Sequence, residues 1–332
     1  MKTRWGILST ANIGVSKVIP AIQKASNCEV VAIASRSYKN AAEVAKRLGI
    51  PKAYGSYDEL LHDKDIDVIY NPLPNNLHVP FTLKACKAGK HVLCEKPIAL
   101  TARDAYYLKT KLFTSQQFKI MEAFMYKFHP QWIKAKQLID SGAIGEVKVV
   151  HSFFSYFNTN PDDIRNRVEI GGGALLDIGC YCISFPRYIF GKEPVRAVSY
   201  VNRDKEMLVD RITSGMLDFG DGLSASFTCS TQLSSFQRTQ IIGTKGRLEI
   251  EIPVNAPNDK ETRIFIYADG KSEEIVFPVC DQYTLQAEQF SSAILNNHPV
   301  PVSFDDAILN MDVIDALFES EKKGTWVKVK YL

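Results

Sequence analysis

The chain has 332 residues, which is enough for two domains, and its 45% hydrophobic and 23% charged residues are ordinary proportions for a globular protein. The net charge is only +3, with no basic tail and no stripe of lysine and arginine, which argues against nucleic acid or an anionic membrane as a partner. The N-terminus leads directly into a strand-like segment without room for a signal peptide, and we expect no apolar stretch of membrane-spanning length, so the predicted location is cytoplasmic.

The seven cysteines are scattered and mostly lie in apolar runs, as reduced core thiols do. Cys180 and Cys182 are separated by one residue, whereas most zinc knuckles have two residues between paired cysteines, and no second pair lies near them. We therefore expect no metal site.

The first third of the chain alternates strand-like and helix-like segments. Short apolar runs predict the strands, and apolar residues that recur at three- and four-residue spacing predict the helices between them. The predicted strands are residues 4–10, 30–34, 68–70, 92–94 and 119–123. The predicted helices are residues 13–25, 40–48, 79–88 and 102–114. This repetition indicates an α/β fold with a doubly wound, parallel Rossmann sheet over residues 1–123.

The loop after the first predicted strand retains one glycine of the dinucleotide-binding fingerprint. It reads Ser9-Thr10-Ala11-Asn12-Ile13-Gly14, with serine and alanine at the first two glycine positions. Small residues still allow a pyrophosphate to approach the backbone at a helix N-terminus. We therefore expect this loop to bind a cofactor; a tight turn without a ligand is the alternative, which the strand-helix units that follow disfavour.

The second predicted strand ends at Ser35-Arg36-Ser37. An NAD site places an acidic side chain at this point for the ribose hydroxyls. A guanidinium and two hydroxyls instead suit a 2′-phosphate, because arginine binds phosphate as a fork. The sequence therefore predicts NADP rather than NAD; an exposed loop arginine is the alternative interpretation.

Glu95-Lys96-Pro97 directly follows the strand predicted at residues 92–94. A charge at the carboxyl end of a parallel strand faces the ligand crevice of an open α/β sheet, so Lys96 is a candidate catalytic residue. A cis peptide at Pro97 would be a turn that aims this lysine.

From residue 124 the pattern changes to a helix at residues 130–141 and longer strands with alternating polarity. These strands are predicted at residues 147–157, 197–202, 213–219, 223–231, 237–242, 246–252 and 263–267. Turn pairs such as Asp221-Gly222 separate several of them, as hairpins require. Residues 124–332 are therefore predicted to form an α+β domain on a large, mainly antiparallel sheet, with a C-terminal helix at 304–322 near the domain junction.

One face of this sheet is expected to stay open after helices cover the other. Aromatic residues such as Phe153, Phe157 and Phe227 are assigned to that open face. Large exposed apolar surfaces mark interfaces, so we expect a homo-oligomer, either a dimer or a tetramer, that forms through the sheet.

Three consecutive glycines, Gly171 to Gly173, open a predicted helix that carries Asp177 and Tyr181. Glycines let the backbone approach other groups closely, and residues four apart lie on one face of a helix. Asp177 and Tyr181 are therefore candidate catalytic residues. A first-turn helix charge and a core aromatic residue are the structural alternative.

Together these motifs resemble the Gfo/Idh/MocA family of NAD(P)-dependent oxidoreductases over nearly the whole chain. The matching segments are Arg4 to Leu8, Asn71 to His78, Glu95-Lys96-Pro97, Glu122 to Tyr126, Gly171 to Tyr181, and Gly243 to Gly246. Tyr181 stands where many relatives carry histidine, and is similar to the branch that contains glucose-fructose oxidoreductase, NADP-dependent xylose dehydrogenases and dimeric dihydrodiol dehydrogenase. The resemblance implies that Lys96, Asp177 and Tyr181 surround the reacting carbon and the nicotinamide.

The resemblance also implies two sets of binding residues. Cofactor contacts are expected from Ser9, Thr10, Ala11, Asn12, Ile13, Ser35, Arg36, Ser37, Leu73, Pro74, Asn75, His78, Glu95 and Lys96. Substrate contacts are expected from Lys96, Tyr126, Arg165, Asp177 and Tyr181. Lys127 stands where an arginine is common in the family, which leaves the details of the substrate open.

Hydride transfer at an alcohol carbon also requires proton transfer at its oxygen. Free tyrosine titrates at a pH of about 10, and a nearby ammonium lowers that pKa, so Lys96 and Tyr181 are expected to form an acid-base pair. Asp177 is expected to hold Lys96 charged and to bond a substrate hydroxyl; the immediate proton partner is either Tyr181 or Lys96.

The function expected from these residues is an NADP-dependent oxidoreductase that acts on a sugar or polyol. The alternatives are a ketoreductase of a modified or nucleotide-linked sugar, a trans-dihydrodiol dehydrogenase and, in a different class, a non-catalytic NADP-binding regulator.

Overall fold

The computed structural model describes residues 1–112 and 118–331, and the chain divides into two compact units. Unit 1 contains Met1–Met125 and Asp281–Ile308, and unit 2 contains Tyr126–Cys280 and Leu309–Leu332. The first boundary lies at residue 125, where the sequence predicts 123. The return of residues 281–308 to unit 1 is a feature that the single predicted boundary does not include.

Unit 1 contains a parallel sheet with helices between its strands. The strands are β1 (Thr3–Leu8), β2 (Cys28–Ala34), β3 (Lys52–Tyr54), β4 (Val68–Asn71), β5 (His91–Cys94) and β6 (Ile120–Glu122). The helices are α1 (Ile19–Lys24), α2 (Tyr38–Leu48), α3 (Tyr57–His62), α4 (Asn75–Lys87), α5 (Ala102–Leu112) and α8 (Gln282–Leu295), and a π-helical turn at Gly14–Val18 precedes α1. The strand order β3-β2-β1-β4-β5-β6, parallel throughout, is that of the doubly wound dinucleotide fold and confirms the predicted fold class.

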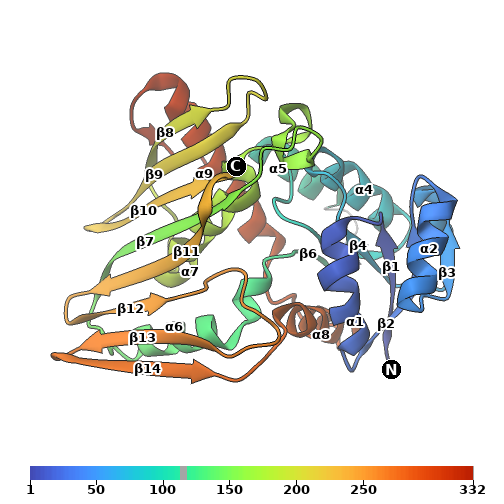
Figure 1. The fold of residues 1–332 in the computed structure, drawn as a ribbon, viewed down its shortest axis with the longest axis horizontal. Coiled ribbons are helices and arrows are strands. Elements are labelled where there is room, and N and C mark those ends of the chain that lie inside the picture. Colours follow the sequence, from blue (N-terminus) through green and yellow to red (C-terminus); the bar gives the residue numbers. More distant parts are fainter. Residues whose placement is uncertain (113–117, 332) are drawn as a thin grey trace. The chain divides into compact units, whose positions relative to one another are not determined.

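Helix α8 completes the core of unit 1 although it lies far along the chain. It packs beside α1 and against β1 and β2 (Figure 1). The Phe290 ring contacts the Trp5 ring edge-on, with 6.0 Å between centroids, and the Ser291 hydroxyl lies 2.7 Å from that of Thr3 and 3.0 Å from the Cys28 thiol. These tertiary contacts explain why α8 belongs to unit 1, although no helix was predicted at these residues and they were assigned to the domain predicted at residues 124–332.

Unit 2 contains a larger, mixed sheet. Its strands are β7 (Val147–Phe157), β8 (Arg196–Arg203), β9 (Asp210–Gly220), β10 (Leu223–Ser230), β11 (Gln232–Gly243), β12 (Gly246–Ile250), β13 (Thr262–Ala268), β14 (Lys271–Phe277) and β15 (Val327–Lys328). Its helices are α6 (Pro130–Asp140), α7 (Cys180–Phe190) and most of α9 (Phe304–Lys323). The strand order is β14-β13-β12-β11-β7-β10-β9-β8-β15, and every pair is antiparallel except β7 with β10, which confirms a mainly antiparallel sheet (Figure 1).

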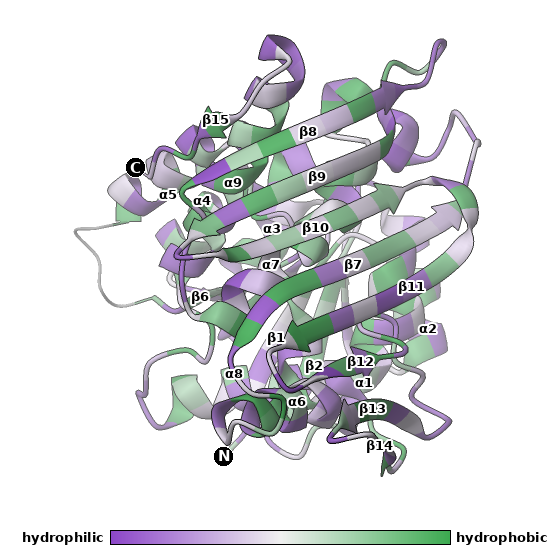
Figure 2. Cartoon of the chain, turned by 90° about the vertical axis from the view of Figure 1, so that its left-hand side faces the viewer, coloured by the Kyte–Doolittle hydropathy of each residue, from purple (hydrophilic) through white to green (hydrophobic). Residues whose placement is uncertain are grey.

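Helices cover one face of this sheet, and the described residues of unit 2 leave the central part of the other face open (Figure 2). The exposed side chains Phe157, Tyr200, Met216 and Phe236 are 48–68% accessible to solvent. Phe227 was assigned to this open face, and that prediction is wrong: it is 2% exposed. Its ring lies on the covered face, within 2.6 Å of where a Cβ on the cross-strand Gly215 would be.

The helical stretch Val168–Phe190 corrects the expectation that no apolar segment has membrane-spanning length. By length and composition alone this stretch could cross a membrane. The three glycines within it make the apolar run less apparent in the sequence. Of its most apolar window, 72% is buried inside the protein. A buried core helix satisfies the same criterion, so the stretch is accounted for by the core of unit 2.

Candidate active site

The loop that follows β1 turns sharply at Ser9. Ser9 has a φ of 77°, in the left-handed region that glycine usually occupies, and its N–H donates to the Ala34 carbonyl at 2.9 Å. At Gly14, where the helical segment begins, an added Cβ would lie 3.5 Å from the Tyr70 ring, an ordinary van der Waals distance. The loop therefore has a sharp turn and a helix N-terminus, the two features with which dinucleotide folds bind a pyrophosphate, and serine replaces the first glycine; pyrophosphate binding by this loop stays a prediction.

Tyr57, a residue that the sequence patterns did not select, lies near Arg36 and Ser9. Burial raises the pKa of the Tyr57 phenol, while the Arg36 charge and hydrogen bonds with the Ser9 and Arg36 side chains oppose that rise of the pKa. The Tyr57 ring packs edge-on against Phe81, with 5.2 Å between centroids. The cluster joins the predicted phosphate loop to the end of β2, and its exposed guanidinium suits a 2′-phosphate.

The two serines beside Arg36 shape the turn that presents it. The N–H of buried Ser35 donates to the Tyr54 carbonyl at 3.2 Å, which joins the end of β2 to β3. The Ser37 hydroxyl accepts from the Asn40 N–H at 3.4 Å and caps α2. A direct contact of either hydroxyl with a cofactor stays a prediction.

His78 is buried against the segment that carries Lys96. Its Nε2 lies 2.7 Å from the Leu73 carbonyl oxygen, and its Nδ1 lies 2.7 Å from that of Pro97. Burial and, to a smaller extent, the Lys96 charge lower the pKa of His78 to about 4, although the contacts with the two carbonyl oxygens raise it. The ring ties the start of α4 to the turn after β5; the predicted cofactor contacts of His78, Leu73, Pro74 and Asn75 stay predictions.

The turn that carries Lys96 is fixed on both sides. Tyr70 donates its hydroxyl to Glu95 Oε1 at 2.6 Å, and the N–H that follows Pro97 donates to the buried carboxylate of Glu122 at 2.7 Å. The Lys96–Pro97 bond, whose isomer the sequence left open, is cis. Unit 1 therefore holds a half-buried lysine at the carboxyl end of β5, the edge of the sheet where such folds bind ligands.

In unit 2 the three consecutive glycines form a turn that other residues would disrupt. Gly171 and Gly173 have φ values of 86° and 117°, in the region that L side chains rarely adopt. An added Cβ on Gly172 would lie 2.6 Å from the Arg165 carbonyl oxygen, and one on Gly173 would meet the Asp210 carboxylate. The glycines therefore let the start of the segment that carries Asp177 and Tyr181 pack directly on neighbouring backbone.

Asp210 fixes the first turn of the segment that carries Asp177. Its Oδ2 accepts from the Leu175 N–H at 2.7 Å and from the Thr213 hydroxyl at 2.9 Å. Burial raises the pKa of Asp210 to about 6, although these hydrogen bonds and the Arg203 charge lower it. The segment is π-helical over Leu175–Gly179 and continues into α7, and π-helical turns are frequent at functional sites.

One carboxylate oxygen of Asp177 accepts a hydrogen bond from Tyr156 and forms an ion pair with Arg165. The Tyr156 hydroxyl lies 2.5 Å from Asp177 Oδ2, and Arg165 Nε lies 3.3 Å from the same atom. The Asp177 charge is the main cause of the raised pKa of Arg165, and burial followed by that charge raises the pKa of Tyr156. Asp177 and Arg165, both predicted site residues, are thus brought together by the structure, and Tyr156 joins them.

Tyr181 is 4% exposed and lies in an aromatic cluster. Its ring centroid is 6.1 Å from that of Tyr126 and 6.2 Å from that of Phe154, both edge-on. Tyr126 is fully buried, and its hydroxyl lies 2.8 Å from that of Ser184. Tyr126 therefore supports the Tyr181 ring, and its direct contact with a substrate stays a prediction.

The predicted site residues fall into two sets by unit. Lys96 and the predicted cofactor residues belong to unit 1, whereas Tyr126, Arg165, Asp177 and Tyr181 belong to unit 2. Joint action of the two sets stays a prediction.

Tyr70 and Tyr156 were not selected from the sequence, although their shared position near the end of a strand could have identified them. Each is the next-to-last residue of its strand, β4 or β7, and each donates its hydroxyl to a carboxylate that the sequence did select. Tyr57 and Asp210 carry no such signal, because only tertiary packing reveals their partners.

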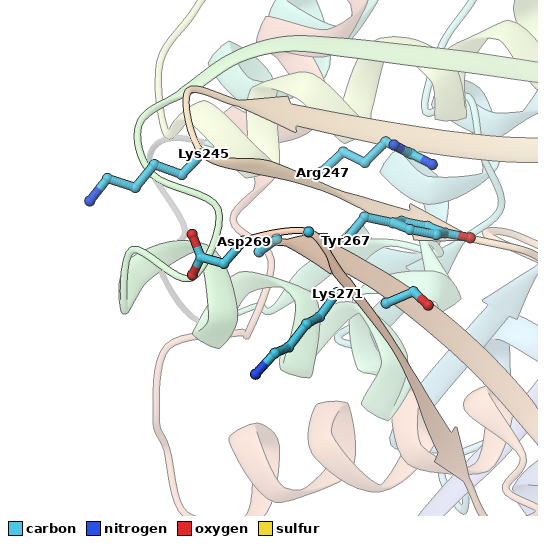
Figure 3. Close-up of a pocket in the computed structure, with 8 residues that line it drawn as sticks. Lys245, Arg247, Tyr267, Asp269 and Lys271 are labelled. Carbon is cyan, nitrogen blue, oxygen red and sulfur yellow. The ribbon is translucent and has the colours of Figure 1, made fainter.

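A separate cavity of about 460 Å³ lies at the β12–β14 end of the large sheet (Figure 3). Its lining consists of Lys245, Arg247, Tyr267, Ala268, Asp269, Gly270, Lys271 and Ser272. The amino groups of Lys245 and Lys271 point away from Arg247, which stacks on Tyr267 at 3.8 Å from its ring centroid. The charges do not converge on one point, and none of the predicted site residues lines this cavity.

Comparison with known proteins assigns both parts of the chain to one family. A model of an oxidoreductase family with an NAD-binding Rossmann fold matches residues 3–122, and a model of the GFO/IDH/MocA C-terminal domain matches residues 132–249. An uncharacterized oxidoreductase of Rhizobium meliloti is 40% identical over 331 residues, which cover 98% of this chain and 99% of that one. D-xylose 1-dehydrogenase (NADP(+)) 2 of Haloferax volcanii is 36% identical over 325 residues, with the same two coverages.

A solved structure shows the same fold over nearly the whole chain. The crystal structure of a 3-ketoreductase from Actinomadura kijaniata, in complex with NADP and TDP-benzene, has a TM-score of 0.91 at 28% identity. The match covers 96% of this chain and 98% of the ketoreductase. The chain therefore belongs to the Gfo/Idh/MocA family of oxidoreductases, with the family's NAD-binding Rossmann domain and its C-terminal domain.

Proposed function

We propose that this protein is an NADP-dependent oxidoreductase that transfers a hydride between the nicotinamide and a carbon of a sugar or polyol. The observation that carries the proposal is the lysine turn of unit 1: Lys96 lies half-buried at the carboxyl end of β5, fixed by Glu122 and, through Glu95, by Tyr70. A dinucleotide fold that only binds its ligand has no need of a fixed amino group at this edge.

The residues of unit 1 fit NADP. The backbone of the loop at Ser9 would hold the pyrophosphate, Arg36 with Tyr57 would hold the 2′-phosphate, and Glu95 would accept from the ribose or the carboxamide. When bound, NADP supplies the hydride acceptor or donor. The Haloferax relative is named for NADP(+), and the Actinomadura structure contains NADP, which supports this choice.

Lys96 and Tyr181 are the proposed acid-base pair. An ammonium near a phenol favours the phenolate, so Lys96 would lower the pKa of Tyr181 and let it exchange a proton with the substrate oxygen at neutral pH. Asp177 would accept from a substrate hydroxyl. Solved structures of the Actinomadura ketoreductase include one variant with a tyrosine replaced by phenylalanine and others with a lysine replaced by alanine or glutamate. The same two residue types form the acid-base pair proposed for this chain.

The proposed substrate is a sugar or polyol, because the relatives are named for such compounds. One is a dehydrogenase of D-xylose, and another, 31% identical to this chain, is a reductase of a dTDP-linked dideoxy sugar. An acceptor such as the Asp177 carboxylate suits the hydroxyl groups of an aldose such as D-xylose.

We also propose that a second copy of the chain covers the open face of the large sheet. Phe157, Tyr200, Met216 and Phe236 project from this face, and apolar side chains gathered in this way mark interfaces.

The proposed function is tested with purified protein, NADP or NAD, and a panel of aldoses, inositols and trans-diols, by following the absorbance of the reduced cofactor. NADP-dependent turnover of an aldose or inositol is expected. Tyr181→Phe should lower kcat by roughly two orders of magnitude, the usual scale of acid-base catalysis. Tyr188→Phe, the same change on the same helix, should leave kcat nearly unchanged. NADP binding without turnover of any compound would favour a regulator instead.

The choice of cofactor has its own test. Arg36→Ala should raise the KM for NADP at least ~10-fold, because it removes a charge-assisted bond to phosphate, and should leave the KM for NAD unchanged. Equal KM values for NADP and NAD in the wild type would refute the assignment to NADP.

A further inference from the structure

We propose that Tyr156 is the positioning residue that orients the Asp177 carboxylate and keeps it ionised. The inference rests on the proposed role of Asp177 as the acceptor of a substrate hydroxyl. Tyr156 itself makes no claimed contact with substrate or cofactor; it acts through Asp177.

The geometry around Asp177 leads to this assignment. The Tyr156 hydroxyl is 2.5 Å from Asp177 Oδ2, the short distance typical of an O–H donor bonded to a carboxylate. The Asp177 side chain is 12% exposed, so water competes little for this contact. The Asp177 N–H donates to the Gly173 carbonyl at 3.1 Å, so Asp177 is held at its backbone by the glycine turn and at its carboxylate by Tyr156.

Tyr156 is suited to be a permanent donor. Burial and the Asp177 charge both raise the pKa of its phenol, so the proton stays on Tyr156 at any pH at which the enzyme works. The residue is the next-to-last of β7, an eleven-residue strand that pairs with β10 on one side and β11 on the other. A donor on such a strand has little freedom to move, in contrast to a donor on a loop.

Arg165 contacts the same Asp177 oxygen from the segment that lies between β7 and the three glycines. Its Nε lies 3.3 Å from Asp177 Oδ2, while Asp163 Oδ1 accepts from its backbone N–H at 2.9 Å and from its Nη1 at 3.3 Å. Its carbonyl accepts from the Gly173 N–H at 2.8 Å, which ties it to the glycine turn. Arg165 lies farther from Asp177 Oδ2 than Tyr156 does, and its guanidinium also contacts Asp163. Arg165 therefore contributes a positive charge near the Asp177 carboxylate, whereas the Tyr156 hydroxyl fixes the orientation of that carboxylate.

The consequence for the proposed reaction is a preorganised acceptor. A carboxylate with one oxygen fixed by a phenol has a defined orientation, so a substrate hydroxyl that donates to it is placed without reorganisation. Hydrogen bonds to the charged form also lower the pKa of a carboxyl group. Tyr156→Phe removes the hydroxyl and keeps the ring. The variant therefore tests the effect of the hydroxyl on the orientation and on the pKa of the Asp177 carboxyl group, without loss of the aromatic ring.

The direct test measures the pKa of Asp177 and does not depend on turnover. Wild type and Tyr156→Phe are labelled with ¹³C at the aspartate carboxyl carbon and titrated by NMR, with Asp177→Asn to assign the signal. The Asp177 pKa is expected to rise by about one to two units in Tyr156→Phe, the scale of a hydrogen bond to a charged group. Tyr267→Phe, a hydroxyl deletion on β13 of the same unit, should leave it unchanged. Equal Asp177 pKa values in wild type and Tyr156→Phe would overturn the proposal.

Kinetics separate this inference from the function on which it rests. Tyr156→Phe should raise the KM for the sugar roughly 10-fold and leave the KM for NADP unchanged. In the pH profile of kcat/KM, the acidic limb should shift to higher pH together with the Asp177 pKa. If the wild type turns over no substrate, the proposed function fails, while the NMR titration still decides the role of Tyr156. If the wild type is active and Tyr156→Phe retains its KM and pH profile, the positioning role fails alone.

Discussion

Replacing Asp210 with asparagine should change how the stability of the protein depends on pH. Asp210 is a 1% exposed carboxyl group with its pKa raised from 3.8 to about 6, chiefly by burial. Because folding raises this pKa, the folded protein binds the proton more tightly than the unfolded chain does. The contribution of Asp210 to stability is therefore fully present below about pH 4 and is lost as the pH rises through about 6.

The size of this effect follows from the shift in the pKa. A change from 3.8 to about 6 is about two units, which corresponds to ~3 kcal/mol. Asp210→Asn does not titrate, and its amide oxygen can still accept from the Leu175 N–H. The free energy of unfolding of the variant should therefore rise relative to wild type by ~3 kcal/mol between about pH 4 and pH 7.

Urea unfolding followed by circular dichroism, at a series of pH values across this window, measures the difference directly. Asp218→Asn, on the same strand, is a control of opposite sign, because the Gly220 N–H and Arg196 lower the Asp218 pKa. The stabilisation from Asp218 is present above its ordinary pKa and is lost as the pH falls, so this control should diverge from wild type only in acid. A difference between Asp210→Asn and wild type that stays constant over the whole window would refute the reasoning.

Three further predictions follow from other contacts. Tyr57→Phe should raise the KM for NADP roughly 10-fold and leave the KM for NAD unchanged, because it removes a hydroxyl that lies near Arg36 and Ser9. The same change at the exposed Tyr38 is the control, and equal effects of Tyr57→Phe on both cofactors would contradict a 2′-phosphate site. Gly172→Ala should destabilise the protein by more than ~2 kcal/mol in thermal unfolding, because its Cβ would lie 2.6 Å from a backbone oxygen. Gly191→Ala, at a φ of 59° with open space around it, should cost only ~1 kcal/mol, and similar losses would argue against the steric account. Met216→Glu on the open sheet face should dissociate the oligomer in light-scattering measurements, whereas Val276→Glu on edge strand β14 should not; an unchanged mass for Met216→Glu would place the interface elsewhere.

The fold was largely predictable because most of its elements have strong periodic patterns. The predicted β7 has the observed bounds of Val147–Phe157, and α9 ends at Lys323 where the prediction ends at 322. The short elements β3 and α3, the edge strands β14 and β15, and helix α8 were not predicted from the sequence. β3 and α3 are short, β14 is mostly exposed and polar, and the two-residue β15 is defined only by its pairing with β8. The last two residues of the helix predicted at 102–114 lie outside the described residues.

The candidate site was predictable to the level of residue type and element, but not of contact. Strand and helix periods place Lys96 at the end of β5 and Asp177 in the first turns of a helix, because those positions follow from local sequence. They do not reveal that Tyr156 and Arg165 converge on one oxygen of Asp177, since β7 and the loop before the glycines meet only in the folded chain. Phe227 shows the same limit: alternation identifies two faces of β10, and only packing decides which one is covered.

The return of α8 to unit 1 has a consequence for biosynthesis. Thr3 and Cys28 are translated 288 and 263 residues before Ser291, which contacts both of them, and Trp5 likewise precedes its ring partner Phe290. Unit 1 therefore cannot complete its core until residues 281–308 have been translated. Until then, part of its apolar surface stays uncovered. A truncated chain that ends at residue 125 should for this reason require a chaperone or aggregate, whereas one with residues 281–308 joined to it by a flexible linker should stay in solution.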